Sequence, residues 1–181
     1  MENGRTMANP APLGLAAFGI TTFLISTGFA NFWHEDFLPA FMVVALFYGG
    51  IVSILVSIME FFRGDSIGVA FFGTFGAFWL AIWYENTIPH ESKGLPGVFF
   101  MCFAAAAFIF WMAVMKRSML HNLFGFLVTL TIATEAYGIW GGGHSGAIKI
   151  AGWFGILTAL VALYMAAKAL IDEEHGKVVL P

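Results

Sequence analysis

One ionisable side chain, Glu135, lies well inside a long apolar stretch of this 181-residue sequence. A charge at membrane depth costs several kcal/mol, so this carboxyl is expected to have either a polar partner or a functional role. Residues three or four positions apart share one face of a helix. The face that carries Glu135 consists of Phe124, Val128, Thr131, Glu135, Gly138 and Gly142. It indicates either a pore wall with a protonatable carboxyl, or a carboxyl held by an interhelical hydrogen bond or by a charge pair with Lys149 or His144.

The remaining chemistry-bearing residues do not form a catalytic, haem or metal motif. Membrane haem carriers need histidine pairs at depth, but every histidine here falls outside the middle of the apolar stretches. These are His34, His90, His121, His144 and His175. The single cysteine, Cys102, excludes an internal disulfide or a cysteine metal cluster. Without an HExxH, CxxC or phosphate-loop motif, we expect no enzyme activity, metal or cofactor.

Composition indicates that lipid is the solvent of this chain. Hydrophobic residues make up 60% and charged residues only 10% of the sequence, against roughly 25% charged residues in an ordinary soluble domain. A small soluble domain could not hide so much apolar surface. These values exclude a disordered chain, a nucleic-acid binder and a soluble α/β enzyme.

Six apolar runs of about 17 to 24 residues are each long enough to cross the roughly 30 Å hydrocarbon layer as a helix. The predicted spans are Leu13–Ala30, Leu38–Met59, Ile67–Tyr84, Leu95–Met115, Asn122–Trp140 and Ile148–Ile171. We therefore predict an all-α, multi-pass membrane protein. Residues 13–171 form the transmembrane domain, residues 1–12 an N-terminal tail with a motif, and residues 172–181 a C-terminal tail.

Positive charges predict the orientation of these spans. With the N-terminus inside, the inner segments carry six basic residues: Arg5, Arg63, Lys116, Arg117, Lys168 and Lys177. The outer segments carry only Lys93 and Lys149. Cytoplasmic loops of membrane proteins are enriched in Lys and Arg, so we expect both termini in the cytoplasm and the chain in the plasma membrane.

The first span begins with an unusual proline-containing segment. It consists of Asn9, Pro10, Ala11, Pro12, Leu13, Gly14 and Leu15 (NPAPLGL). Asn9 is a good N-cap, and Pro10 at the first helical position removes an amide donor without cost. The remaining donors and the helix dipole favour an anion, but a rigid helix start explains the segment equally well.

The second span carries a weaker polar stripe of Gly49, Ser53, Ser57 and Glu60. Serines in membrane helices usually bond to their own helix backbone, so the stripe alone is weak support for a site. Glu60 falls near Arg63 at the predicted cytoplasmic end, where the two side chains are expected to form a solvated pair.

NPAPLGL and five further blocks, in order, resemble the acetate uptake transporter (succinate–acetate permease) family along nearly the whole chain. The further blocks are FYGG at 47–50, EFFRGDSIG at 60–68, FGTFGAFW at 72–79, AGWFGI at 151–156 and GKVVLP at 176–181. The resemblance implies a homo-oligomer, a hexamer of six-helix protomers with a pathway through each. It implies transport of acetate and related small monocarboxylates, sometimes succinate, by an anion channel or a proton-coupled symporter.

By the same resemblance, a hydrophobic constriction falls on Phe18, Phe75 and Val128. The family commonly has Tyr where Phe75 stands, Gln where Ser53 stands and an apolar residue at Glu135. We expect polar groups beside the ring to hold the carboxylate. Besides the NPAPLGL backbone, these candidates are Thr21, Thr22, Tyr48, Ser53, Trp79 and Thr131. Our hypothesis is that Glu135 is protonated during transport, because an ionised Glu would repel the substrate.

Two alternatives remain open. A neutral-molecule channel would pass ammonia or acetic acid, since some members of the family are linked to ammonium export. A membrane-embedded sensor or scaffold would carry no flux at all.

Overall fold

The computed structural model describes residues 7–33, 37–89, 94–140 and 145–181. Six helices within these ranges are long and apolar enough to cross a membrane. The elements are α1 (Ala11–Phe29), α2 (Leu38–Val44), η2 (Ala45–Val52), α3 (Ser53–Arg63), α4 (Ser66–Thr87), α5 (Gly97–Val114), α6 (Met119–Ile139) and α7 (Ser145–His175). Because α2, η2 and α3 form one continuous span, the predicted number of spans is confirmed.

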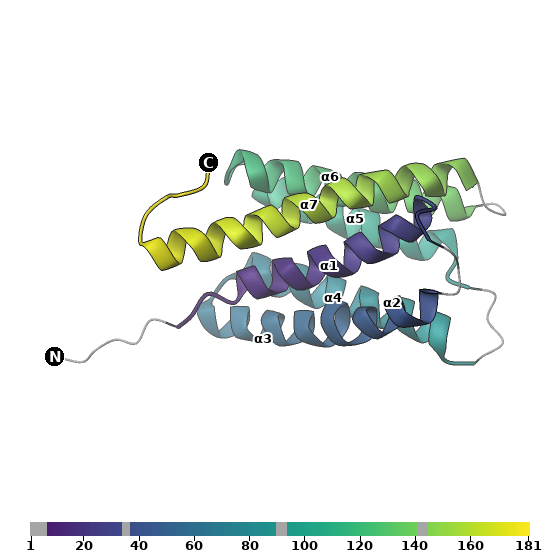
Figure 1. Ribbon diagram of the computed structural model, residues 1–181, viewed down its shortest axis with the longest axis horizontal. Helices are drawn as coiled ribbons and strands as arrows, with labels where there is room; N and C mark the ends of the chain where they lie inside the picture. The colour runs from purple at the N-terminus through teal and green to yellow at the C-terminus, as the bar shows by residue number, and fades with distance from the viewer. Residues whose placement is uncertain (1–6, 34–36, 90–93, 141–144) are drawn as a thin grey trace.

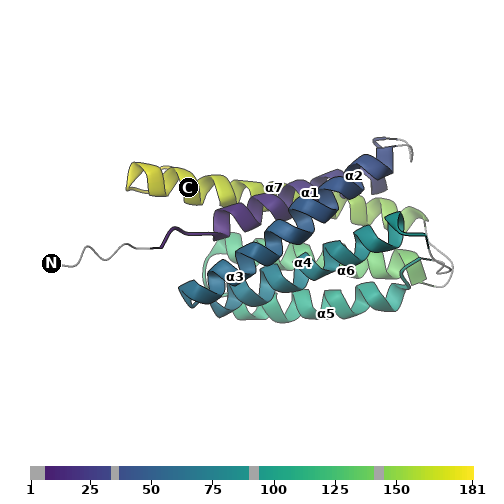
Figure 2. The same ribbon diagram turned by 90° about the horizontal axis from the view of Figure 1, so that it is seen from below.

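Both chain ends lie at the same end of the bundle. Figure 1 shows α1 starting and α7 finishing there, and Figure 2 shows the same arrangement after a quarter turn. The α3–α4 and α5–α6 connections lie at this end too, and we call it the terminal end. The C-terminal ends of α1, α4 and α6 lie at the other end, which we call the loop end.

Small residues allow the helices to pack closely. The main neighbours are α1 with α7, α5 with α6, α6 with α7, and α3 with α4. A Cβ atom on Gly152 of α7 would lie 2.6 Å from the backbone nitrogen of Ala30 and 2.8 Å from the carbonyl oxygen of Ser26. Membrane helices associate through such close backbone contacts because lipid provides no hydrophobic drive between them.

The second span differs from the uniform helix that we expected. Its middle, η2, is a π-helix that contains the FYGG block. A Cβ atom on Gly49 would lie 2.7 Å from Thr21 Cγ2 and 2.8 Å from Trp79 Cγ. The wider π turn therefore brings this backbone directly against α1 and α4. Such π segments inside α-helices often occur at functional sites.

Several helix boundaries differ from the predicted ones by a few residues, and two of these shifts have a visible cause. Helix α6 begins at Met119 rather than at Asn122, because the Ser118 hydroxyl caps it by accepting the His121 backbone N–H at 3.3 Å. Helix α7 continues to His175, past the predicted end at Ile171. An ion pair of 3.0 Å between Lys168 and Asp172, one turn apart, supports this polar last part.

Candidate functional site

Three cavities follow one another through the bundle. The terminal cavity has a volume of about 100 Å³ and is lined by residues such as Ala11, Asp65 and Arg117 from the terminal end. The central cavity has about 30 Å³, room for about two water molecules. The loop cavity has about 230 Å³ and reaches Asn86 and Gly94.

Shared lining residues connect these cavities in series. Val128 lines both the terminal and the central cavity. Four residues line both the central and the loop cavity: Ile25, Phe78, Trp79 and Glu135. The three cavities therefore lie in series, with the smallest one in the middle.

An apolar ring separates the terminal from the central cavity. Phe18, Phe75 and Val128 come from α1, α4 and α6, and all three line the central cavity. Their exposed fractions are 4%, 1% and 2%, and the ring centroids of Phe18 and Phe75 are 5.5 Å apart. The three side chains are thus buried inside the bundle around one cavity, with the two aromatic rings in contact.

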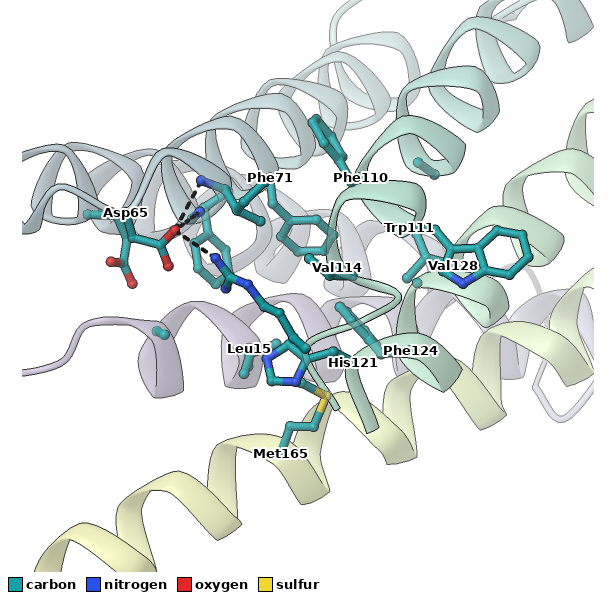
Figure 3. Close-up of a pocket in the computed structure, with 18 residues that line it drawn as sticks. Leu15, Asp65, Phe71, Phe110, Trp111, Val114, His121, Phe124, Val128 and Met165 are labelled. Carbon is teal, nitrogen blue, oxygen red and sulfur yellow. Dashed lines mark hydrogen bonds and ion pairs between the residues drawn. The ribbon is translucent and has the colours of Figure 1, made fainter. Parts of the chain in front are cut away.

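Two further phenylalanines, which the sequence analysis did not assign to the ring, close it from the terminal side. The centroid of Phe18 lies 5.4 Å from that of Phe71 and 5.6 Å from that of Phe124, and Phe71 lies 4.8 Å from Phe75. Figure 3 shows Phe71 and Phe124 between Asp65, at one end of the terminal cavity, and Val128 at the other. Phe124 belongs to the helix face of Glu135 that the sequence predicted. For Phe71, the only indication in the sequence was its position four residues before Phe75.

Polar atoms gather in the central cavity directly beyond the ring. Thr22 Oγ1, Ser26 Oγ and Trp79 Nε1 are buried and have no hydrogen-bond partner among the described residues, and all three side chains line this cavity. An unpaired buried polar atom costs about 1 to 3 kcal/mol. The cavity is therefore suited to a small guest that accepts hydrogen bonds, because the indole N–H is a donor only.

Thr131 and Thr158 complete the polar wall of the central cavity. Their hydroxyl oxygens are 2.9 Å apart, and each hydroxyl also lies within hydrogen-bond distance of a carbonyl oxygen in its own helix. Thr22, Trp79 and Thr131 were expected from the sequence, whereas Ser26 and Thr158 were not. Ser26 follows Phe18 and Thr22 at four-residue steps, so the helical spacing of α1 carried a usable signal for it.

Glu135 lies where the central cavity meets the loop cavity. Its side chain is buried, with an exposed fraction of 6%, and it makes no ion pair or hydrogen bond with any described residue. Lys149 is exposed and does not pair with it, whereas His144 lies outside the described residues. Gly138, further along the same face, packs against Ile148, and Gly142 also lies outside the described residues.

Glu60 is buried, contrary to the expected solvated pair. Its exposed fraction is 0%, although Arg63 Nη1 does contact Glu60 Oε2 at 3.3 Å. The cause is close packing of α3 on α4, since a Cβ atom on Gly68 would lie 2.8 Å from Glu60 Cγ. Glu60 Oε1 has no hydrogen-bond partner among the described residues, and Glu60 lines the terminal cavity.

The NPAPLGL segment forms a rigid helix start that borders the terminal cavity. Helix α1 begins at Ala11 with Pro10 as N-cap, one residue later than expected. Asn9 Oδ1 still accepts the Ala11 N–H at 3.1 Å, and it also accepts a hydrogen bond from Arg63 at 2.5 Å. Of the segment, Ala11 and Leu15 line the cavity.

The other members of NPAPLGL lie outside the cavity lining. Pro12 is buried, whereas Leu13 is exposed. Gly14 packs against the ring of Phe72 so closely that a Cβ atom would overlap it. These contacts anchor the start of α1.

A family model described as GPR1/FUN34/yaaH matches residues 2–181, almost the entire chain. The chain belongs to this family. The resemblance found in the sequence is thereby confirmed, and with it the six-helix, multi-pass membrane architecture.

Two bacterial relatives match this chain over nearly their whole length, whereas a yeast relative is longer. The succinate-acetate/proton symporter SatP of Escherichia coli K12 is 28% identical, covering 97% of this chain and 95% of the relative. A solved structure of the bacterial acetate channel SatP matches with a TM-score of 0.91 at 28% identity, over 97% of this chain and 99% of that one. The ammonia transport outward protein 2 of Saccharomyces cerevisiae is 25% identical, over 96% of this chain and 65% of the relative.

Three residues that we expected from the sequence to bind the carboxylate do not line any of the three cavities. The Thr21 hydroxyl donates to the Ala17 carbonyl oxygen of its own helix at 2.8 Å. Ser53 is buried at the end of η2, and Tyr48 is half-buried within η2. None of the three is among the residues that line the terminal, central or loop cavity.

Proposed function

We propose that this chain transports acetate and related small monocarboxylates across the membrane, by a route through the three cavities of each protomer. The observation that carries the proposal is the apolar ring of Phe18, Phe75 and Val128 between two cavities, with unpaired polar atoms directly behind it. The printed names of the bacterial relatives, an acetate channel and a succinate-acetate/proton symporter, support the same substrate class. Neither name describes an enzyme.

The two ends of acetate match the two parts of the site. Its methyl group is apolar and small, so it fits the ring at little cost. Its carboxylate loses much hydration energy when it enters a dry apolar environment without partners. The N–H of Trp79 and the hydroxyls of Thr22 and Ser26 are placed to receive it once the methyl group has passed. Narrow apolar constrictions between polar sites are a recurrent way to gate a pore.

Glu135 is the proton-coupling group in this proposal. A permeating anion in the central cavity meets this carboxyl next, on the way to the loop cavity. Two negative charges in one small buried space repel each other strongly. Glu135 therefore carries a proton while the anion passes. A protein that exchanges this proton in each cycle is a symporter, and one that keeps it is an anion channel.

The orientation and assembly of the protein are part of the same proposal. Arg63, Lys116, Arg117 and Lys168 all belong to segments at the terminal end, and positive residues favour the cytoplasmic side. Both termini are therefore cytoplasmic in the plasma membrane. The protomers assemble as homo-oligomers, and the family resemblance favours a hexamer with one route in each protomer.

Uptake of labelled acetate into proteoliposomes tests this function. We expect uptake well above that of empty liposomes, and competition by small monocarboxylates and, more weakly, by succinate. Uptake driven by voltage alone identifies an anion channel, whereas uptake that requires a pH gradient identifies a proton symporter. Uptake equal to that of empty liposomes under both gradients would contradict the proposal and favour a non-transporting sensor or scaffold.

A second candidate is conduction of a neutral molecule, ammonia or acetic acid. The name of the yeast relative, which refers to ammonia transport, favours it, and an apolar ring passes a neutral solute more readily than an ion. Current across a planar bilayer separates an acetate anion channel from this neutral conduction. Acetate anions carry current, whereas ammonia and acetic acid carry none.

A further inference from the structure

The terminal cavity carries a positively charged side chain, Arg117, at its rim. Among the described residues that line the terminal, central and loop cavities, Arg117 is the one Lys or Arg. It lies in the short connection between α5 and α6, and its side chain is 46% exposed. A permeating anion that enters from the terminal end therefore meets this guanidinium before it meets the ring.

Asp65, the ion-pair partner of Arg117, has hydrogen bonds that do not involve Arg117. Arg117 Nη2 lies 3.6 Å from Asp65 Oδ1, beyond ordinary hydrogen-bond length. Asp65 is the N-cap of α4, and the same oxygen already accepts the backbone N–H groups of Ile67 and Gly68 at 3.0 and 3.2 Å. Figure 3 shows these contacts converging on Asp65. Because exposed ion pairs contribute little stability, releasing Arg117 costs little.

The two carboxylates of the terminal cavity are each compensated without Arg117. Glu60 pairs with Arg63 at 3.3 Å. Asp65 faces the positive end of the α4 dipole and two of its N–H groups. Arg117 is thus the group whose charge is free to be shared with a bound anion.

We propose that Arg117 is an anion-capture residue, which exchanges its contact with Asp65 for the carboxylate of a substrate entering the terminal cavity. The planar guanidinium forms two parallel hydrogen bonds to a carboxylate. The methyl group then points toward Phe71 and Phe124, which form the apolar floor of this cavity. This inference rests on the proposed function and adds an affinity site in front of the ring.

Concentration dependence of acetate uptake tests the capture site, in proteoliposomes with the terminal end outward. We expect Arg117→Gln to raise the half-saturation concentration about five- to tenfold with a maximal rate near that of the wild type. The matched control is Lys116→Gln, which removes the same charge from the neighbouring exposed residue and should change the value less than twofold. Arg117→Lys, which keeps the charge without the planar fork, should fall between.

Asp65→Asn tests the same exchange by changing the partner of Arg117 instead of Arg117 itself. Asparagine is also a good N-cap, so α4 keeps its start while the substrate loses its competitor for Arg117. The half-saturation concentration should fall about two- to fivefold, a change of roughly 1 kcal/mol at most. The double variant with Arg117→Gln should lose this gain, whereas a gain that persists would show that Asp65 acts by repulsion alone and would overturn the exchange.

Salt provides a further readout. The difference between wild type and Arg117→Gln should shrink between about 0.05 M and 1 M salt, because the screening length falls to about 3 Å. If Arg117→Gln behaves like Lys116→Gln while wild type takes up acetate, the capture site is wrong and the proposed function stands. If wild type takes up no acetate, the proposed function fails and the capture site falls with it.

Discussion

Trp79 is the residue whose chemistry most clearly separates a binding site from simple packing. Its indole nitrogen is buried without a hydrogen-bond partner among the described residues, and its side chain lines both the central and the loop cavity. A residue that served packing alone would be replaceable by another aromatic residue of similar shape. A donor to a carboxylate would not.

We therefore expect Trp79→Phe to weaken acetate transport. Losing one hydrogen bond to a charged group costs about 1.5 to 3 kcal/mol, so the half-saturation concentration should rise at least tenfold. Labelled acetate uptake over a concentration series measures it. The matched control is Trp153→Phe on α7, an exposed tryptophan that packs on Phe32. If both variants behave alike, Trp79 does not bind the substrate.

Glu135 gives the second prediction at this scale. Glu135→Gln keeps the size of the side chain and cannot exchange a proton, so uptake should lose its dependence on pH. Acetate uptake measured at several pH values checks this, with Glu174→Gln at the exposed end of α7 as control. A variant with the rate and pH profile of the wild type would exclude Glu135 from proton coupling.

The helices position these residues, and their contacts were only partly predictable from the sequence. Hydropathy located all six spans because lipid requires long apolar helices. It did not reveal η2, since the π turn depends on Gly49 fitting against Thr21 and Trp79 of other helices. It also placed Glu60 in water, because burial of that side chain depends on Gly68 in the next span.

The residues of the site were also only partly predictable from the sequence. The Glu135 face led to Val128 and Thr131 through spacing within one helix, and both line the central cavity. Phe18 and Phe75 came from family resemblance, because spacing cannot relate side chains on different helices. Phe71 and Thr158 were missed for the same reason. Their positions depend on how α4 and α7 pack against α1 and α6.

Close packing of α7 on α1 gives a prediction at the level of elements. Gly152→Ala should lower the melting temperature in detergent by several degrees. Its new Cβ would overlap backbone atoms of α1, and overpacking costs about 1 to 3 kcal/mol.

Gly146→Ala, in the same helix with open space around the site, provides the control. It should leave the melting temperature unchanged or raise it slightly, because alanine favours helices. Equal melting temperatures for the two variants would show that α7 does not pack on α1 as described.

At the scale of the whole molecule, the bundle forms two wider cavities on either side of a narrow one. The volumes are about 100, 30 and 230 Å³, and the smallest cavity lies beside the ring. On the proposed route, the apolar end of a substrate must pass the ring between polar groups on its two sides. We therefore propose that the ring sets the upper size limit.

The size selectivity of transport is the most direct test of the role that we propose for the ring. Phe75→Ala removes the most buried aromatic side chain of the ring, so the ratio of butyrate to acetate uptake in proteoliposomes should rise severalfold above that of the wild type. Phe108→Ala, on the exposed face of α5, should leave the ratio unchanged. If Phe75→Ala transports acetate but keeps the wild-type ratio, the ring does not lie on the route.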